Sequence, residues 1–232
     1  MDLSIYLAFM EAELEAMRFH EGKTAWLGCK LSSCNSGISF HPTKIDHCNM
    51  LVLTDETPPN NHDPTEVAQE LISAAQRIGC EKILLDFQRE PTELSLHIIQ
   101  KILERTHIPV GVAAEHAEEF NCAVFLSPPP LWTPLCEALQ SWKNREIWLE
   151  IAPESGCITI TEDASIYTAT PSRGAYPLYD NKMHLSYRTQ IDDRTVKVYL
   201  QRSTDHILSW LHHAQEAGIR TAIGLYGLLP DF

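Results

Sequence analysis

The sequence predicts an α/β protein folded as a single closed barrel of parallel strands and helices, with an added antiparallel hairpin. Short apolar runs alternate with helical patterns after residue 50, which is typical of βα units that feed a parallel sheet. The chain has 232 residues, and closed α/β barrels commonly use about 200–250 residues as one unit. Apolar residues alternate with polar ones within 156–200, which predicts a hairpin at 184–200. We therefore expect one barrel domain over 1–232.

The first 48 residues give the weakest pattern. Residues 3–10 are compatible with a strand, 11–19 have helical spacing, and 24–31 again have the composition of a strand. The sequence leaves open whether this segment completes the barrel or covers its base.

The first clear βα unit begins with a strand at 49–53. Asp63 is the predicted N-cap of the following helix, with Pro64 at its first position and Glu66 completing a capping box. Gly79 is predicted to end the helix.

Further strands and helices follow in alternation. Residues 82–87 are apolar on both faces, as expected for a strand between the barrel interior and a helix layer. A helix at 92–105 and strands at 109–114 and 122–126 come next. The acidic stretch 115–121 between the two strands is short for a complete crossover helix.

The last elements carry the clearest boundary signals. We expect a helix at 133–142 and a strand at 146–151 before the hairpin. Ser203 is the predicted N-cap of a helix that runs to 217, and the final strand is expected at 221–226.

Charge and composition exclude several classes of partner. The chain has 31 acidic and 18 basic residues and a formal charge of −13, which disfavours binding to nucleic acid or to an anionic membrane surface. No apolar run approaches the roughly 18 residues of a membrane span, and the first residues lack the basic region of a signal peptide. We therefore expect a cytoplasmic protein, and the sequence does not predict an oligomeric state.

The cysteines and glycines point to neither a metal nor a cofactor. The seven cysteines are widely spaced without a CxxC pair, so we expect free and mostly buried thiols. Glycine-rich phosphate loops and the GxSxG motif are also absent from the sequence.

Polar residues gather where the predicted parallel strands end, which is the face of a barrel that carries function. Acids and phenols there suit a neutral ligand rich in hydroxyl groups, although about half of such residues would simply end strands at a solvated surface. The predicted ligand-binding residues are Asp55, Trp148, Tyr187, Arg188 and Tyr226, and the candidate catalytic residues are Asp86, Gln88, Glu115 and Glu150.

Two segments resemble a known family. Residues 81–88 (Glu-Lys-Ile-Leu-Leu-Asp-Phe-Gln) resemble the fourth-strand motif Asp-x-x-Asp-x-Asp-x-Glu of glycoside hydrolase family 18, the chitinase-like TIM barrels. Tyr187, the hairpin after it, the helix from Ser203 and the strand at 219–226 are similar to the closing units of that family.

The resemblance implies a TIM-like barrel and a substrate-assisted mechanism. In that family the motif glutamate protonates the leaving oxygen, the neighbouring aspartate orients the acetamido group of the substrate, and a tyrosine supports that group. By resemblance the orienting residue is Asp86, the supporting residue is Tyr187, and Gln88 occupies the position of the acid.

Gln88 changes the functional expectation, because an amide has no proton to give at neutral pH. The sequence therefore favours a saccharide-binding barrel that lacks the acid of the family. One alternative is an active glycosidase that uses Glu115, Glu150 or Glu90, although Glu115 is better explained as an N-cap or first-turn acid of a short helix. A non-catalytic barrel that binds another protein is the third reading.

Overall fold

The computed structural model describes residues 2–40, 45–56, 58, 60–161, 166–169, 178–192, 194–229 and 232. The chain forms two compact units. We call Met1–Ser127, Asn144–Glu150 and Ile219–Phe232 the barrel unit, and Pro128–Lys143 with Ile151–Gly218 the insert unit. The expectation of one domain over 1–232 stays a prediction.

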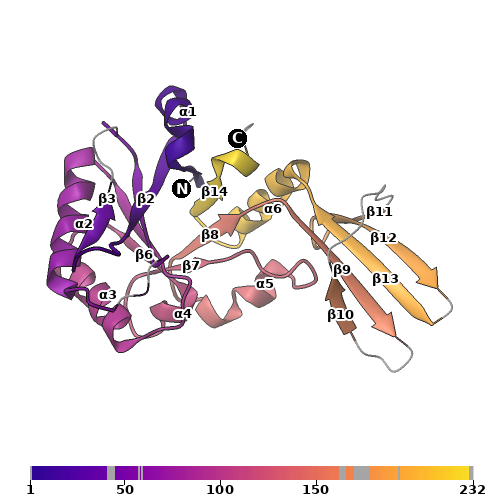
Figure 1. Ribbon diagram of the computed structural model, residues 1–232. Helices are drawn as coiled ribbons and strands as arrows, with labels where there is room; N and C mark the ends of the chain where they lie inside the picture. The colour runs from indigo at the N-terminus through magenta and orange to yellow at the C-terminus, as the bar shows by residue number, and fades with distance from the viewer. Residues whose placement is uncertain are drawn as a thin grey trace. The chain divides into compact units, whose positions relative to one another are not determined.

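The barrel unit is a closed parallel barrel, as predicted (Figure 1). Among the described residues, eight parallel strands follow the order β1-β14-β8-β7-β6-β5-β4-β2, and pairing of β1 with β2 closes the cylinder. The strands are β1 Ser4–Phe9, β2 Lys23–Leu31, β4 Met50–Thr54, β5 Lys82–Asp86, β6 Val110–Ala113, β7 Ala123–Leu126, β8 Ile147–Ile151 and β14 Thr221–Leu225. Strands β1 and β2 therefore complete the barrel, and β3 (Ile38–Phe40) pairs antiparallel with β2 at its edge.

Helices cover the outside of the strands. Helices α2 (Pro64–Ile78) and α3 (Glu93–Arg105) pack against each other beside the sheet, as Figure 1 shows. Helix α1 (Leu14–Phe19) follows the 3-10 turn η1 (Glu11–Glu13), α4 (Ala114–Ala117) is a single turn, and the 3-10 turn η4 (Tyr226–Leu228) follows β14.

The start of α2 corrects one sequence prediction. Asp63 caps the helix by accepting a hydrogen bond from the Thr65 N–H at 2.8 Å, as expected. Glu66 does not complete a capping box. Its carboxylate instead accepts the Ser36 hydroxyl, while the Asp63 N–H donates to the Ser36 carbonyl at 2.9 Å. Glu66 therefore contacts Ser36, a residue remote in the sequence, and not the neighbouring Asp63 N–H that a capping box would require.

The barrel interior is filled by side chains from alternate positions of the strands. Trp148 is the largest of them, and a Cβ built on Gly111 of the nearby β6 would collide with its indole ring. This close approach explains why β6 carries glycine at that position. The interior cluster consists of Tyr6, Ala8, Ala25, Met50, Val52, Leu84, Ala123, Phe125, Trp148 and Ile223.

The insert unit contains a five-stranded antiparallel sheet in the order β10-β9-β13-β12-β11. Strands β12 (Leu185–Asp192) and β13 (Thr195–Arg202) form the predicted hairpin, with Tyr187 opposite Leu200. The other strands are β9 Glu154–Thr161, β10 Ile166–Ala169 and β11 Leu178–Asp180, and the long helix is α6 Thr204–Glu216 after Ser203.

The helix expected at 133–142 is wrong as a continuous element. The segment forms a four-residue helix α5 (Leu135–Ala138) and a 3-10 turn η3 (Gln140–Trp142). Leu135 and Leu139 are its buried apolar side chains, and this pair is too short a stripe to anchor several helical turns. No described helix has the length and apolar character needed to cross a bilayer.

Candidate functional site at the carboxyl ends of the barrel strands

Asp86 lies at the carboxyl end of β5 and faces the axis of the barrel. Leu84 belongs to the interior cluster, and side chains two residues apart on a strand share a face. The side-chain amide of Gln88, two residues further on, donates a hydrogen bond to the Asp86 carboxylate. Two candidate catalytic residues are thus in direct contact, with Asp86 half-buried and Gln88 exposed.

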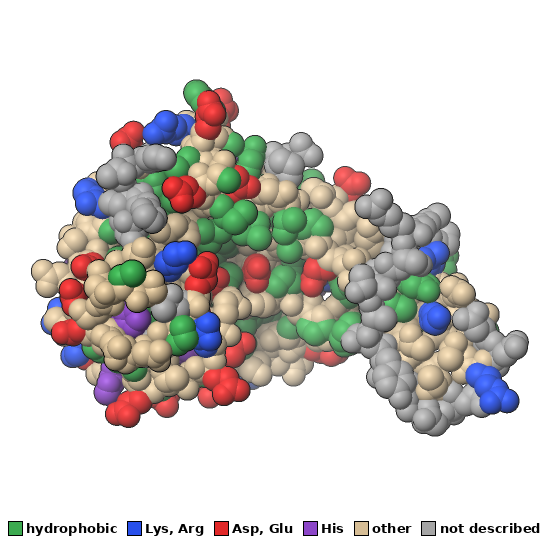
Figure 2. All heavy atoms as spheres, in the orientation of Figure 1, with side chains coloured by type: hydrophobic (Ala, Val, Ile, Leu, Met, Phe, Trp, Pro, Cys, Tyr) green, Lys and Arg blue, Asp and Glu red, His purple; other side chains and the backbone are tan. Residues whose placement is uncertain are grey.

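Burial and the neighbouring acids shift the pKa of Asp86 upward. Burial raises the pKa of Asp86 above the usual value of an aspartic acid, and the hydrogen bond from Gln88 opposes that shift. The negative charges of Asp55 and Glu115 raise this pKa further. Asp86 therefore lies in an acidic environment. Elsewhere, acidic side chains are scattered over the face of the barrel unit that Figure 2 shows.

Asp55 holds the loop that follows β5. Its carboxylate is 2% exposed and accepts the backbone N–H of Gln88 at 2.8 Å and of Arg89 at 3.1 Å. The Arg89 guanidinium in turn donates to the carbonyls of Asp55 at 2.9 Å and Glu56 at 2.8 Å. Asp55 thereby positions Gln88, and the contribution of Arg89 to this clamp was not anticipated from the sequence.

The turn after β6 brings Glu115 and His116 to the same side of the barrel. Glu115 is exposed in the first turn of α4. His116 is 2% exposed, its ring meets Phe87 edge to face at 5.6 Å, and neither ring nitrogen has a hydrogen-bond partner among the described residues. Burial lowers the pKa of His116, against the influence of Asp55 and Glu115. His116 is therefore a buried, neutral imidazole close to the carboxyl ends of the barrel strands, the region that we call the mouth.

The two acids proposed as alternatives occupy different surroundings. Glu150 is half-buried near the end of β8 and shares its face of the strand with Trp148, so it is directed toward the barrel axis. Glu90 is exposed in the loop after β5.

The aromatic candidates also differ. Tyr226 is half-buried after β14 and stacks on Phe9, with ring centroids 4.5 Å apart. Trp148 is 0% exposed, and its indole N–H donates to Glu146 at 2.8 Å, at the opposite end of β8 from Glu150. Trp148 therefore fills the core and offers no exposed face to a ligand.

Tyr187 and Arg188 belong to the insert unit and lie on opposite faces of its sheet. Tyr187 packs on the cluster of Leu131, Leu185 and Leu200, whereas the Arg188 guanidinium lies 4.2 Å from the centroid of the Tyr199 ring. Their assignment to ligand binding stays a prediction.

The segment 81–88 that resembles the family motif spans β5, so its first and last residues lie at opposite ends of the strand. Glu81, at its first position, accepts hydrogen bonds from the Tyr6 hydroxyl and the Lys23 ammonium, both at 2.5 Å. These contacts lie at the amino end of β5, opposite to Asp86. Glu81 therefore contributes to the base of the barrel.

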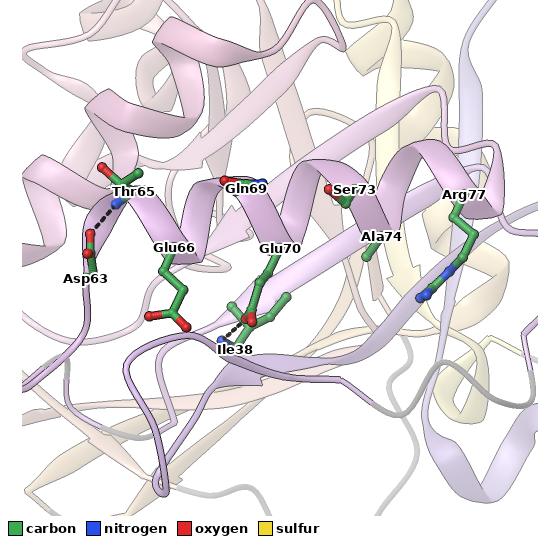
Figure 3. Close-up of a pocket in the computed structure, with 9 residues that line it drawn as sticks. All are labelled: Ile38, Asp63, Thr65, Glu66, Gln69, Glu70, Ser73, Ala74 and Arg77. Atoms are coloured by element: carbon green, nitrogen blue, oxygen red, sulfur yellow. Dashed lines mark hydrogen bonds between the residues drawn. The ribbon is translucent and has the colours of Figure 1, made fainter.

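A second hollow lies outside the barrel, along α2. The groove has a volume of about 750 Å³ and is lined by Asp63, Glu66 and Glu70 among others (Figure 3). Glu70 accepts the Ile38 N–H at 2.8 Å, and Glu66 is engaged by Ser36. Because Glu66 and Glu70 are already engaged in joining α2 to the segment of β3, the mouth of the barrel is the better candidate for a functional site. The described residues contain no group of three or more His, Cys, Asp or Glu placed to hold a metal ion.

Together, the structure defines a closed (β/α)8 barrel with carboxylates at the mouth and an antiparallel insert between β8 and β14. This is the fold of glycoside hydrolase family 18 chitinases and related enzymes. No family model and no curated protein matches the sequence.

Solved structures give the likeness in detail. The spore cortex-lytic enzyme SleL of Bacillus cereus shares 12% identity and a TM-score of 0.57, over 98% of this chain and 71% of that enzyme. Class V chitinase from Nicotiana tobaccum shares 9% identity and a TM-score of 0.58, over 97% of this chain and 93% of that one. A chitinase from Cycas revoluta in complex with (GlcNAc)3 shares 8% identity and a TM-score of 0.54, over 95% and 94%. At these identities the likeness establishes the fold.

Proposed function

We propose that this protein binds oligosaccharides of N-acetylglucosamine at the mouth of its barrel, without hydrolysing them by the mechanism of family 18. The contact between the Gln88 amide and the Asp86 carboxylate carries the proposal. It places a group that cannot donate a proton to a leaving oxygen beside the residue that resembles the orienting aspartate.

The chemistry of this pair suits binding. A positioned general acid contributes about 10²- to 10⁴-fold to a rate, and an amide cannot supply that contribution. Asp86 can accept a hydrogen bond from a hydroxyl or acetamido N–H, and the carbonyl oxygen of Gln88 is a second acceptor. The clamp by Asp55 keeps Gln88 in place before a ligand arrives, which lowers the entropic cost of binding.

Two further observations support a saccharide. The Tyr226 ring is half-buried at the mouth and held by Phe9, as a surface for the apolar face of a sugar would be. Chitinases with the same barrel fold have been crystallised with (GlcNAc)3 and NAG4.

Calorimetric titration with (GlcNAc)3 and (GlcNAc)4 tests the proposal. We expect saturable binding and no release of shorter sugars over hours by chromatography. Asp86→Asn should weaken binding about tenfold or more, because a hydrogen bond to a charged group contributes about 1.5–3 kcal/mol. Glu90→Gln is the matched control, since it removes an exposed charge from the same loop and should leave the affinity unchanged. Absence of heat with both sugars, together with unchanged melting temperatures, would refute the proposal.

Glu150 favours one alternative, an active glycosidase, because its side chain is directed toward the barrel axis. If wild-type protein releases product and Glu150→Gln abolishes that release while the fold is kept, the protein is a hydrolase with a different acid. If turnover instead requires Gln88→Glu, the substitution has restored the missing acid and the binding proposal for the wild type holds.

A further inference from the structure

Cys48 and Cys80 meet beneath the barrel strands β4 and β5. Their sulfur atoms are 3.4 Å apart, and both thiols are free and buried, with 0% and 8% exposure. Each cysteine lies two residues before the first paired position of its strand, Cys48 before Met50 of β4 and Cys80 before Lys82 of β5. Among the described residues no other two cysteines are within hydrogen-bonding distance.

The backbone on both sides of this pair is fixed. Gly79 ends α2 in the left-handed conformation with φ of 80°, and the Cys80 N–H donates to the Ala75 carbonyl at 2.9 Å. The Asn49 carbonyl accepts the N–H groups of Glu81 at 2.8 Å and Lys82 at 3.1 Å. The two sulfur atoms are already in contact at 3.4 Å, so a short approach of the side chains is enough to reach the S–S bond length of about 2.05 Å.

We propose that Cys48 and Cys80 form a reversible disulfide, which makes the base of the barrel a redox modification site. The oxidant is a low-molecular-weight disulfide such as oxidised glutathione. The thiolate of one cysteine attacks a sulfur of the oxidant, whose S–S bond breaks and releases a thiolate. The second cysteine loses its proton to solvent and attacks the mixed disulfide, so that the S–S bond between Cys48 and Cys80 forms as the second thiolate leaves. Two protein thiols are oxidised and one external disulfide is reduced to two thiols.

The two thiols have different roles in this exchange. Cys48 donates to the Met50 carbonyl at 3.3 Å and is fully buried. The contact with Cys48 lowers the pKa of Cys80, whereas the same contact and burial raise the pKa of Cys48. Cys80 is also the more exposed of the two, so it is the first nucleophile and Cys48 resolves the mixed disulfide.

Oxidation should stabilise the barrel. The disulfide would close a loop that contains β4 and α2, and constraint of the unfolded chain by such a loop should raise the melting temperature by about 5–10 °C. The bond would also hold together the strands that carry Asp55 and Asp86 at their other ends.

Redox titration of the full chain tests this inference. The protein carries Cys34→Ser and Cys136→Ser, because these two thiols are exposed and would form bonds between molecules. It is equilibrated at several ratios of reduced to oxidised glutathione, quenched with acid, unfolded, alkylated and digested. We expect mass spectrometry to show peptides joined through Cys48 and Cys80, in proportion to oxidised glutathione, while Cys29 stays alkylated. The melting temperature should rise with the same dependence.

Cys80→Ala should abolish the joined peptides and the redox dependence of the melting temperature, and Cys48→Ala serves if the first variant does not fold. Two outcomes would overturn the inference: both cysteines fully alkylated at the most oxidising ratio, or bond formation only in protein unfolded by urea. Neither readout involves a saccharide, so the result is independent of the proposed function.

Discussion

Removal of the Asp55 carboxylate should release the loop that carries Gln88. Asp55→Ala deletes the acceptor of two N–H groups, from Gln88 at 2.8 Å and Arg89 at 3.1 Å. A hydrogen bond to a charged group contributes about 1.5–3 kcal/mol. Both bonds are partly buried, so we expect the free energy of unfolding to fall by about 3 kcal/mol and the melting temperature by about 6–12 °C.

Urea denaturation followed by fluorescence measures this loss, and hydrogen exchange locates it. The amides of Gln88 and Arg89 should lose protection before those of β5. Glu56→Ala is the matched control. Its carboxylate is two-thirds exposed and pairs with Lys30 at 3.2 Å on the surface, so its removal should cost at most about 0.5 kcal/mol. A loss in Asp55→Ala below about 1 kcal/mol, or one no larger than in the control, would refute the role of Asp55 as a clamp.

Three further perturbations test the surroundings of the site. The pKa of His116 is lowered by burial, so the unfolded chain binds the proton more tightly and stability is lost as the pH falls below about 6.5. His116→Leu should remove that acid-side loss in melting curves between pH 7 and pH 5, and an unchanged pH profile would contradict it. The pKa of Asp86 is raised by burial, so its ionisation costs stability as the pH rises above about 3.9. Asp86→Asn should therefore be more stable than wild type at pH 7, with a difference that closes at pH 3 in thermal denaturation. Gly111→Ala should cost about 1–3 kcal/mol in urea denaturation because its Cβ meets Trp148, whereas Gly156→Ala, with Leu131 at 3.4 Å, should cost less.

The sequence predicted the barrel because its local signals agree with the final packing. Helix α2 begins after Asp63, at Pro64, and ends before Gly79, as expected, because capping depends on neighbours within one helical turn. For residues 133–142, by contrast, the local signals did not agree with the final packing. Their helical spacing lacked a continuous apolar surface, so tertiary contacts left only one turn at Leu135–Ala138. Glu66 shows the same limit, because its partner Ser36 is remote in the chain.

The candidate site was predictable in part. The resemblance of 81–88 pointed to Asp86 and Gln88, and the position of Asp86 at the carboxyl end of a predicted strand pointed to the functional face of the barrel. The sequence could not show whether Trp148 or Tyr226 offers a surface to a ligand. Trp148 lies between apolar residues, so the pattern does not tell whether its side chain is buried or accessible. Burial decided that Trp148 belongs to the core.

By itself, then, the sequence determined the class of barrel and the order of its strands along the chain, because both depend on local pattern. Tertiary structure alone decided that Asp55 clamps the loop of Gln88 and Arg89, and that Cys48 meets Cys80. Both arrangements join residues more than thirty positions apart, and such contacts depend on the register of neighbouring strands, which no local pattern encodes.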